Sequence, residues 1–355
     1  MLRVALIGCG EITNMHTDDF NKLSDIMTPV AFCDLVRERA ENRSQKCGGT
    51  AKIYTDYKVM LDEVELDAVF IAVPPYCHGE IEFDLIERGI PFFVQKPIAL
   101  DLDLAKRIRD AAAEKGLITA VGLQMRYLEY VEAARKFCQK NKIVHIEATR
   151  LQGPRVPATT EEWWHDKKLS GGQLVESGIH EFDQIRYCLG AEVTEVSAFA
   201  TNGFASFDPE KHTIDDHVTA MLRFDNGALA MIASGICLDK KEGYPTTRRL
   251  IFSANDRSAE LVAGVGTTIR GEVEATEESV KRDYGELAEL REDGAIFIPR
   301  DPFCPVNCDR TFLEAVISGD GSKIRSPYAD AYKTVAFLLA CNESIDSGNT
   351  VKVKY

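Results

Sequence analysis

The chain opens with a mostly apolar run, Leu2–Ile7, that leads into Gly8-Cys9-Gly10 and then into a segment suited to a helix. Such a run predicts a strand buried inside a sheet. Two glycines one residue apart predict a tight turn from that strand into the helix. The amides at a helix start and the helix dipole attract anions, so this turn favours a pyrophosphate group.

A second apolar segment, Pro29–Cys33, ends in Asp34. An acid at this point can accept hydrogen bonds from both ribose hydroxyls of an adenosine, and it repels a 2′-phosphate. The third motif position holds Thr13 rather than glycine or alanine, so the glycines alone are a weak signal. Together with the strand order they predict NAD as the cofactor, with NADP less favoured. The expected contacts are Gly8, Gly10, Glu11, Ile12 and Asp34.

The expected pattern of strands and helices differs between the two parts of the chain. Residues 1–123 alternate strands with helices, which predicts a doubly wound parallel sheet covered on both faces. The expected strands are residues 2–7, 29–34, 67–73, 91–95 and 117–122, with helices such as Glu80–Arg88 and Leu102–Lys115.

Residues 124–355 are expected to form a second domain on an open, mostly antiparallel sheet, which makes the fold class α/β plus α+β. Alternating strands are expected at residues 143–151, 192–201, 216–224 and 228–237, with Asp225-Asn226-Gly227 as a hairpin turn. The helical stretch Gly172–Leu189 interrupts them, and helices near 307–318 and 327–347 follow. No helix in the sequence obviously covers one face of this sheet, which predicts a homodimer or homotetramer.

Composition narrows the possible partners. The net charge of −14 argues against nucleic acid and anionic membranes. No apolar run reaches the ~20 residues of a membrane span, and nothing resembles a signal peptide. Ten scattered cysteines in a chain of 355 residues indicate a reducing cytoplasm. Cys304 and Cys308 lack a second ligand pair, so no metal site is expected.

Chemistry-bearing residues follow two strands of the N-terminal domain. Parallel sheets bind ligands at the carboxyl ends of their strands. Lys96 lies at such an end, and a lysine there can stabilise a developing alkoxide. The Lys96–Pro97 bond could be cis. Val73, Pro74, His78, Gln95 and Lys96 are therefore expected at the cofactor.

The segment from Gly171 to Asp183 is the second strong signal. On a regular helix, Glu176, His180 and Asp183 would share one face. A well-oriented imidazole is a general base suited to neutral pH. A metal-binding interpretation of the three residues is a minority alternative beside a nicotinamide site.

Aromatic and cationic residues are candidates for the substrate pocket. Arg126 and Tyr127 lie at the domain junction, and Trp163 and Trp164 precede the Gly171 segment. Together with Asp183 they are predicted to contact substrate. His16 has no identifiable partner in the sequence and is expected to be structural.

These motifs resemble the Gfo/Idh/MocA family of NAD(P)-dependent oxidoreductases. The resemblance rests on Gly8-Cys9-Gly10, Asp34, Val73-Pro74-Pro75 with His78, Gln95-Lys96-Pro97, and Gly171-Gly172 through Asp183. It implies an N-terminal Rossmann domain and a C-terminal sheet that forms an oligomer interface. It also implies that Lys96 contacts the substrate hydroxyl and that His180 transfers the proton. Gln95 stands where the family has glutamate, and Glu176 where aspartate is common.

The expected function is an NAD-dependent dehydrogenase of a secondary alcohol in a sugar, inositol or related polyol, by hydride transfer to nicotinamide. Catalysis is assigned to Lys96, His180 and Glu176. Two alternatives remain open. One is a glycoside hydrolase or lyase that uses NAD without net redox change, and the other is a non-catalytic nucleotide or sugar sensor.

Overall fold

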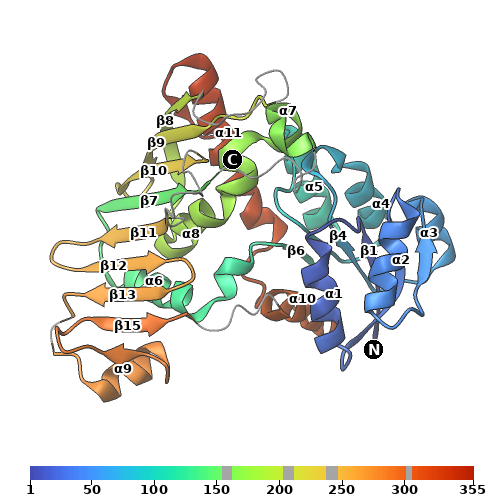
Figure 1. The fold of residues 1–355 in the computed structure, drawn as a ribbon, viewed down its shortest axis with the longest axis horizontal. Coiled ribbons are helices and arrows are strands. Elements are labelled where there is room, and N and C mark those ends of the chain that lie inside the picture. Colours follow the sequence, from blue (N-terminus) through green and yellow to red (C-terminus); the bar gives the residue numbers. More distant parts are fainter. Residues whose placement is uncertain (154–161, 203–211, 237–246, 273, 301–305) are drawn as a thin grey trace. The chain divides into compact units, whose positions relative to one another are not determined.

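The computed structural model describes residues 1–153, 162–202, 212–236, 247–272, 274–300 and 306–355. The chain forms two compact units (Figure 1), Met1–Gln124 with Cys304–Tyr332, and Met125–Phe303 with Lys333–Tyr355. The division predicted after residue 123 placed the whole C-terminal half in one domain. In the structure α10 (Val306–Ser318) instead belongs to the first unit, where it packs against α1 (Thr13–Lys22).

A six-stranded, all-parallel sheet organises the first unit, with the strand order β3-β2-β1-β4-β5-β6. This is the order of a Rossmann sheet, so the predicted doubly wound fold is confirmed. Its further elements are β1 (Leu2–Ile7), β2 (Met27–Cys33), α2 (Arg37–Lys46), β3 (Lys52–Tyr54), α3 (Tyr57–Glu63), β4 (Ala68–Ile71), η1 (Pro75–Cys77), α4 (Glu80–Arg88), β5 (Phe92–Val94), α5 (Leu102–Glu114) and β6 (Thr119–Val121).

Local sequence explains these elements. Every residue of β4 and β5 is buried, as expected for strands covered on both faces. Asp56 and Asp101 cap α3 and α5, because each carboxylate accepts hydrogen bonds from backbone amides of the first turn. Gly89 ends α4 in the left-handed conformation. The strand carboxyl ends consequently converge on one edge, which carries Gly8 and Lys96.

A ten-stranded sheet organises the second unit, in the order β14-β15-β13-β12-β11-β7-β10-β9-β8-β16. Its neighbouring strands are antiparallel except β7 and β10, so the predicted mostly antiparallel sheet is confirmed. Its elements are η2 (Gln124–Tyr127), α6 (Glu129–Lys140), β7 (His145–Leu151), η4 (Glu162–His165), α7 (Lys167–Ser170), η5 (Gln173–Ser177), α8 (Ile179–Leu189), β8 (Val193–Thr201), β9 (His217–Phe224), β10 (Leu229–Gly235), β11 (Thr247–Ser253), β12 (Ser258–Val262), β13 (Gly266–Arg270), α9 (Glu277–Tyr284), β14 (Glu289–Leu290), β15 (Ile296–Pro299), α11 (Tyr328–Ser347) and β16 (Val351–Lys352).

The predicted hairpin lies between β9 and β10. Gly227 has a φ of +88°, and the Phe224 N–H donates to the Ala228 carbonyl at 3.0 Å. Two helices of this unit cover the sheet: α6 packs on β12, β13 and β15, and α8 packs on β7 and β11. Within the described ranges no helix, α11 included, is both long enough and apolar enough to cross a membrane.

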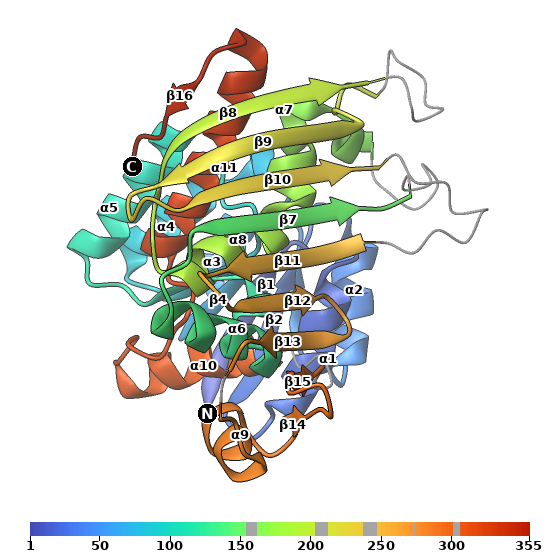
Figure 2. The same cartoon turned by 90° about the vertical axis from the view of Figure 1, so that its left-hand side faces the viewer.

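The opposite face of the sheet is turned toward the viewer in Figure 2, and α6 and α8 lie behind it. Large apolar side chains emerge on this face. Phe199 is 73% exposed, Met221 47% and Met231 38%. Met221 and Met231 are direct partners in the ladder between β9 and β10. The described part of the sheet therefore presents neighbouring apolar side chains to its surroundings.

Candidate active site

The glycine turn follows β1. Gly8 has a φ of +84°, and a Cβ there would lie 2.3 Å from the carbonyl oxygen of Ala72. At Gly10 an added Cβ would meet no atom of the described residues within 4 Å. The fold therefore requires glycine at position 8, whereas the backbone at position 10 is open, and its contact with a pyrophosphate stays a prediction. Thr13, at the third motif position, donates from Oγ1 to the Gly10 carbonyl at 2.6 Å.

Asp34 connects the end of β2 to this turn. Its Oδ2 accepts a hydrogen bond from the Cys9 N–H at 2.7 Å, and its Oδ1 accepts one from the Val36 N–H at 2.8 Å. The side chain is half-buried, while Glu11 and Ile12 on the turn are exposed. The acid thus lies beside the predicted pyrophosphate position, as a ribose contact requires, and that contact stays a prediction.

Arg43 on α2 also holds the turn. Its Nη2 donates to the Gly10 carbonyl at 2.8 Å, and its Nε donates to Thr13 Oγ1 at 2.9 Å. A third hydrogen bond runs from its Nη1 to Asn14. Arg43 could not be predicted from the sequence, because it lies 33 residues after Gly10 and no motif spacing marks it. It places a fixed positive charge beside the turn.

The second strand-end motif lies between β4 and α4. Val73 and Pro74 are half-buried, and the side chain of His78 is fully buried. His78 Nδ1 lies 2.6 Å from Glu82 Oε1, and the Gly79 N–H donates to Glu82 Oε2 at 2.7 Å. Burial works to raise the pKa of Glu82, but His78 and the Gly79 N–H outweigh it and hold that pKa below its ordinary value. His78 therefore supports the start of α4, and its predicted cofactor contact remains untested.

Gln95 and Lys96 follow β5. Gln95 is 4% exposed, and Lys96 is half-buried. The Lys96–Pro97 peptide bond is cis, one of the two forms that the sequence allowed. Lys96 thus lies at the carboxyl edge of the parallel sheet, where the sequence analysis placed it.

In the second unit, Glu176 is held by two donors. Trp164 Nε1 donates to Glu176 Oε2 at 2.6 Å, and Ser177 Oγ donates to the same oxygen at 2.7 Å. Glu176 is 9% exposed and Trp164 is 3% exposed. These two hydrogen bonds hold the carboxylate of Glu176 in place. Trp164 was predicted to contact substrate; the structure gives it this hydrogen bond to Glu176, and its contact with substrate stays a prediction.

The prediction of one regular helix over Gly172–Leu189 is wrong at its start. The Gly178 N–H donates to the Gln173 carbonyl, five residues earlier, at 2.8 Å, so Gln173–Ser177 forms a π-helical turn before α8. A Cβ at Gly178 would lie 2.5 Å from the ring of Phe182, which explains the glycine at this junction. Glu176 lies in this wider turn, where its carboxylate accepts the hydrogen bond from Trp164.

His180 and Asp183 lie on α8 in different surroundings. His180 is half-buried on the first turn, and its carbonyl accepts a hydrogen bond from Gln184 Nε2 at 2.7 Å. Asp183 is 1% exposed and binds the guanidinium of Arg126, with 2.7 Å from Nε to Oδ2. Thr334 Oγ1 also donates to Asp183, at 2.7 Å. The structure therefore joins Arg126 and Asp183 to each other, and their contact with substrate stays a prediction.

The remaining candidates for substrate contact lie in the same unit. Tyr127 is buried, and Trp163 is half-buried against a cluster of Trp164, Ile214 and Ile236. Trp163 and Tyr127 remain candidates for substrate contact. The described ranges contain no group of three His, Cys, Asp or Glu side chains that could hold a metal ion, and Asp183 is committed to Arg126.

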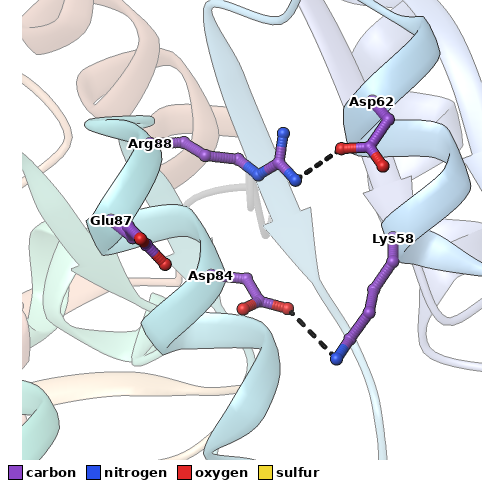
Figure 3. Close-up of a pocket in the computed structure, with 5 residues that line it drawn as sticks. All are labelled: Lys58, Asp62, Asp84, Glu87 and Arg88. Atoms are coloured by element: carbon purple, nitrogen blue, oxygen red, sulfur yellow. Dashed lines mark hydrogen bonds and ion pairs between the residues drawn. The ribbon is translucent and has the colours of Figure 1, made fainter.

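An open, charged pocket lies elsewhere on the first unit, between α3 and α4 (Figure 3). Arg88 binds Asp62 at 2.6 Å, and Lys58 Nζ lies 3.9 Å from Asp84. Glu87 completes the lining. Asp62 and Arg88 lie near the helix ends that precede β4 and β5, which is the sheet edge opposite Gly8 and Lys96. This pocket is therefore separate from the candidate site.

Comparisons with known proteins agree with this geometry. Residues 2–123 match the family model for the oxidoreductase family with an NAD-binding Rossmann fold, and residues 133–256 match the GFO/IDH/MocA C-terminal domain. The chain is similar to the scyllo-inositol 2-dehydrogenase (NAD(+)) of Bacillus subtilis, at 28% identity over 79% of this chain and 73% of that protein.

Two further comparisons bear on length and fold. The uncharacterized oxidoreductase YrbE of Bacillus subtilis is 27% identical over 64% of this chain, and the match spans 65% of YrbE, just under two thirds of its length. The solved structure of a levoglucosan dehydrogenase in complex with NADH superposes with a TM-score of 0.82 at 19% identity, covering 99% of both chains. The matches in both halves of the chain, on the fold described above, show that it belongs to the Gfo/Idh/MocA family of oxidoreductases.

Proposed function

We propose that this chain is an NAD-dependent dehydrogenase that oxidises a secondary alcohol of a sugar, inositol or related polyol. Two groups of residues support the proposed function. One is Lys96 at the carboxyl edge of a Rossmann sheet, and the other is the π turn that holds Glu176 four residues before His180. The inositol dehydrogenase and the levoglucosan dehydrogenase among the relatives support this substrate class.

Each side chain has a chemical role in this proposal. His180 takes the proton of the substrate hydroxyl, and Glu176 orients the imidazole or relays its proton. Lys96 donates a hydrogen bond to the same oxygen and stabilises its developing negative charge. Gly8, Gly10 and the start of α1 hold the pyrophosphate, and Asp34 holds the ribose. NAD, when bound, supplies the carbon that accepts the hydride.

A screen of inositols, free sugars, glycosides and sugar derivatives with NAD tests the proposal. We expect NADH to accumulate, at its characteristic absorbance, in step with a ketone product. A product formed without net NADH would instead indicate the redox-neutral glycoside hydrolase or lyase. Binding of NAD and sugar without any product would indicate a sensor.

Cofactor choice is the first testable consequence. We expect NAD to bind more tightly than NADP, because the Asp34 carboxylate beside the glycine turn repels a 2′-phosphate. Asp34→Ser removes the charge, retains an oxygen that can accept from Cys9, and should shift the preference toward NADP. Calorimetric titration of both cofactors measures this. NADP binding as tight as NAD binding to the unchanged protein would contradict it.

Assembly is the second consequence, and we propose a homodimer or homotetramer joined through the sheet of residues 143–300. The exposed apolar side chains of Phe199, Met221 and Met231 support this interface. Phe199→Glu and Met231→Glu introduce charges on that face and should yield smaller species. Light scattering at micromolar concentration measures the mass, and a monomeric unchanged protein would refute the proposed assembly.

The hydrogen bond between Trp164 and Glu176 gives a third consequence. Trp164→Phe keeps an aromatic ring but removes one of the two donors to Glu176 Oε2. More carboxylate charge then remains to attract a proton to His180, so the acidic limb of the kcat/KM profile should move to higher pH. Ser177→Ala removes the other donor and should move it in the same direction. An unchanged limb in both variants would separate Glu176 from the proton path.

We further propose that the protein works in the cytoplasm. Cys9, Cys188 and Cys341 are buried free thiols. Burial raises the pKa of the Cys341 thiol to about 12, so this group is an unreactive apolar side chain. Unpaired thiols are typical of reducing compartments.

A further inference from the structure

His16 is a fully buried imidazole on α1, just beyond the glycine turn. Three phenylalanine rings surround it. The centroid of its ring lies 5.3 Å from that of Phe70, 5.4 Å from Phe93 and 6.3 Å from Phe20. A polar ring in apolar surroundings is costly unless its nitrogens have hydrogen-bond partners.

Both ring nitrogens of His16 have such partners. Nδ1 lies 2.7 Å from Oδ2 of Asp309, a fully buried carboxylate on α10. Nε2 lies 2.6 Å from Nε2 of Gln95. A carboxylate only accepts hydrogen bonds and an amide nitrogen only donates them. The imidazole between them is therefore neutral, with its proton on Nδ1, and Asp309, His16 and Gln95 form one chain of hydrogen bonds.

Gln95 is also fixed on its other sides. Its backbone N–H donates to the Ile71 carbonyl at 2.8 Å. A Cβ at Gly122 would lie 2.4 Å from Gln95 Oε1, so glycine at the end of β6 makes room for this amide. Lys96 follows Gln95 directly, at a bend of the chain just after β5. Holding the backbone N–H and the amide of Gln95 therefore restrains the backbone from which the Lys96 side chain leaves.

We propose that His16 and Asp309 are positioning residues for Lys96, acting through Gln95. The proposal rests on the proposed catalytic role of Lys96. It accounts for the amide at position 95. A carboxylate there would face His16 Nε2 while Asp309 faces Nδ1, which would require a charged imidazole between two buried carboxylates.

The test exchanges the amide of Gln95 and the carboxylate of Asp309, which lie at the two ends of the chain of hydrogen bonds through His16. Gln95→Glu alone and Asp309→Asn alone should each lower kcat on the order of 10-fold with little change in the KM for sugar, because Lys96 is displaced rather than removed. The double variant moves the carboxylate to the other side of His16 and should recover most of the lost kcat. Asparagine is nearly isosteric with aspartate, so Asp309→Asn remains informative if Gln95→Glu does not fold.

The tautomer of His16 provides a second readout that needs no substrate. In ¹⁵N spectra of the neutral imidazole we expect the proton on Nδ1 in the unchanged protein and on Nε2 in the double variant. This measurement separates failure of the positioning proposal from failure of the proposed function.

Asp25→Asn is the matched control. Asp25 binds Arg310, the residue after Asp309, in a solvent-exposed pair at 3.1 Å. This variant weakens the same attachment of α10 without touching His16, and it should leave kcat and the tautomer unchanged. Equal loss of kcat in this control would overturn the proposal. So would additive losses in the double variant, or a proton on Nε2 in the unchanged protein.

Discussion

Lys96→Met should leave NAD binding intact and lower kcat by about 10²–10³-fold, the range that follows loss of one donor to a developing oxyanion. Methionine keeps the length and volume of the lysine stem but carries no charge and no donor. Lys96 lies at the carboxyl edge of the sheet, after β5, and is half-buried. Calorimetry with NAD and steady-state kinetics on the sugar found in the screen measure the two effects separately.

Lys115→Met is a suitable control for this prediction. Lys115 is an exposed lysine at the end of α5, in the same unit but at the opposite edge of the sheet. Its replacement removes an equal charge from the unit and should not change kcat. Turnover of Lys96→Met close to that of the unchanged protein would remove Lys96 from the mechanism. Loss of NAD binding would assign it to the cofactor alone.

The fold could be predicted largely because its signals are local. The apolar runs at β1, β4 and β5 and the hairpin at Gly227 each lie within ten residues of sequence, and the structure confirms them. The edge strand β3 was missed, because it has three residues and begins with the exposed Lys52. The place of α10 was missed too, since its partner α1 is about 290 residues away and no local pattern connects them.

The residues of the candidate site also fall into those that local sequence could predict and those that it could not. Gly8, Asp34 and Lys96 could be placed because each follows a strand, and the strand ends of a parallel sheet meet at one edge. Residues that act through distant partners could not be placed. Arg43 reaches Gly10 across 33 positions, and Asp309 reaches His16 across 293. From the sequence alone, His16 had no identifiable partner and was therefore interpreted as structural.

The start of the second motif shows a different limit. Regular helical spacing predicted that the Gly171 segment is helical, but it did not predict in which directions its side chains point. The π turn depends on a hydrogen bond between Gly178 and Gln173 and on the space that glycine leaves for Phe182. These are packing interactions that a periodic pattern does not encode.

His180→Ala should abolish most activity in the oxidative direction, because the hydroxyl proton then has no general base. Such groups contribute about 10²–10⁴-fold to the rate. Partial recovery of turnover with added imidazole would show that the base itself, rather than the local fold, was lost. Nearly full turnover of His180→Ala would move the search for the base to Lys96 or Tyr127.

Glu176→Gln is the companion change and should give a weaker enzyme with a shifted pH profile. A carboxylate near an imidazole increases its affinity for a proton. Without that charge His180 should titrate at lower pH, and the acidic limb of the rate profile should move downward. Trp164→Phe is expected to move the same limb upward, because it removes a donor that now withdraws charge from Glu176 Oε2. Glu176→Asp retains the charge and should be the mildest change. Opposite shifts in Glu176→Gln and Trp164→Phe would connect Trp164, Glu176 and His180 in one proton path, whereas a profile that neither variant moves would exclude it.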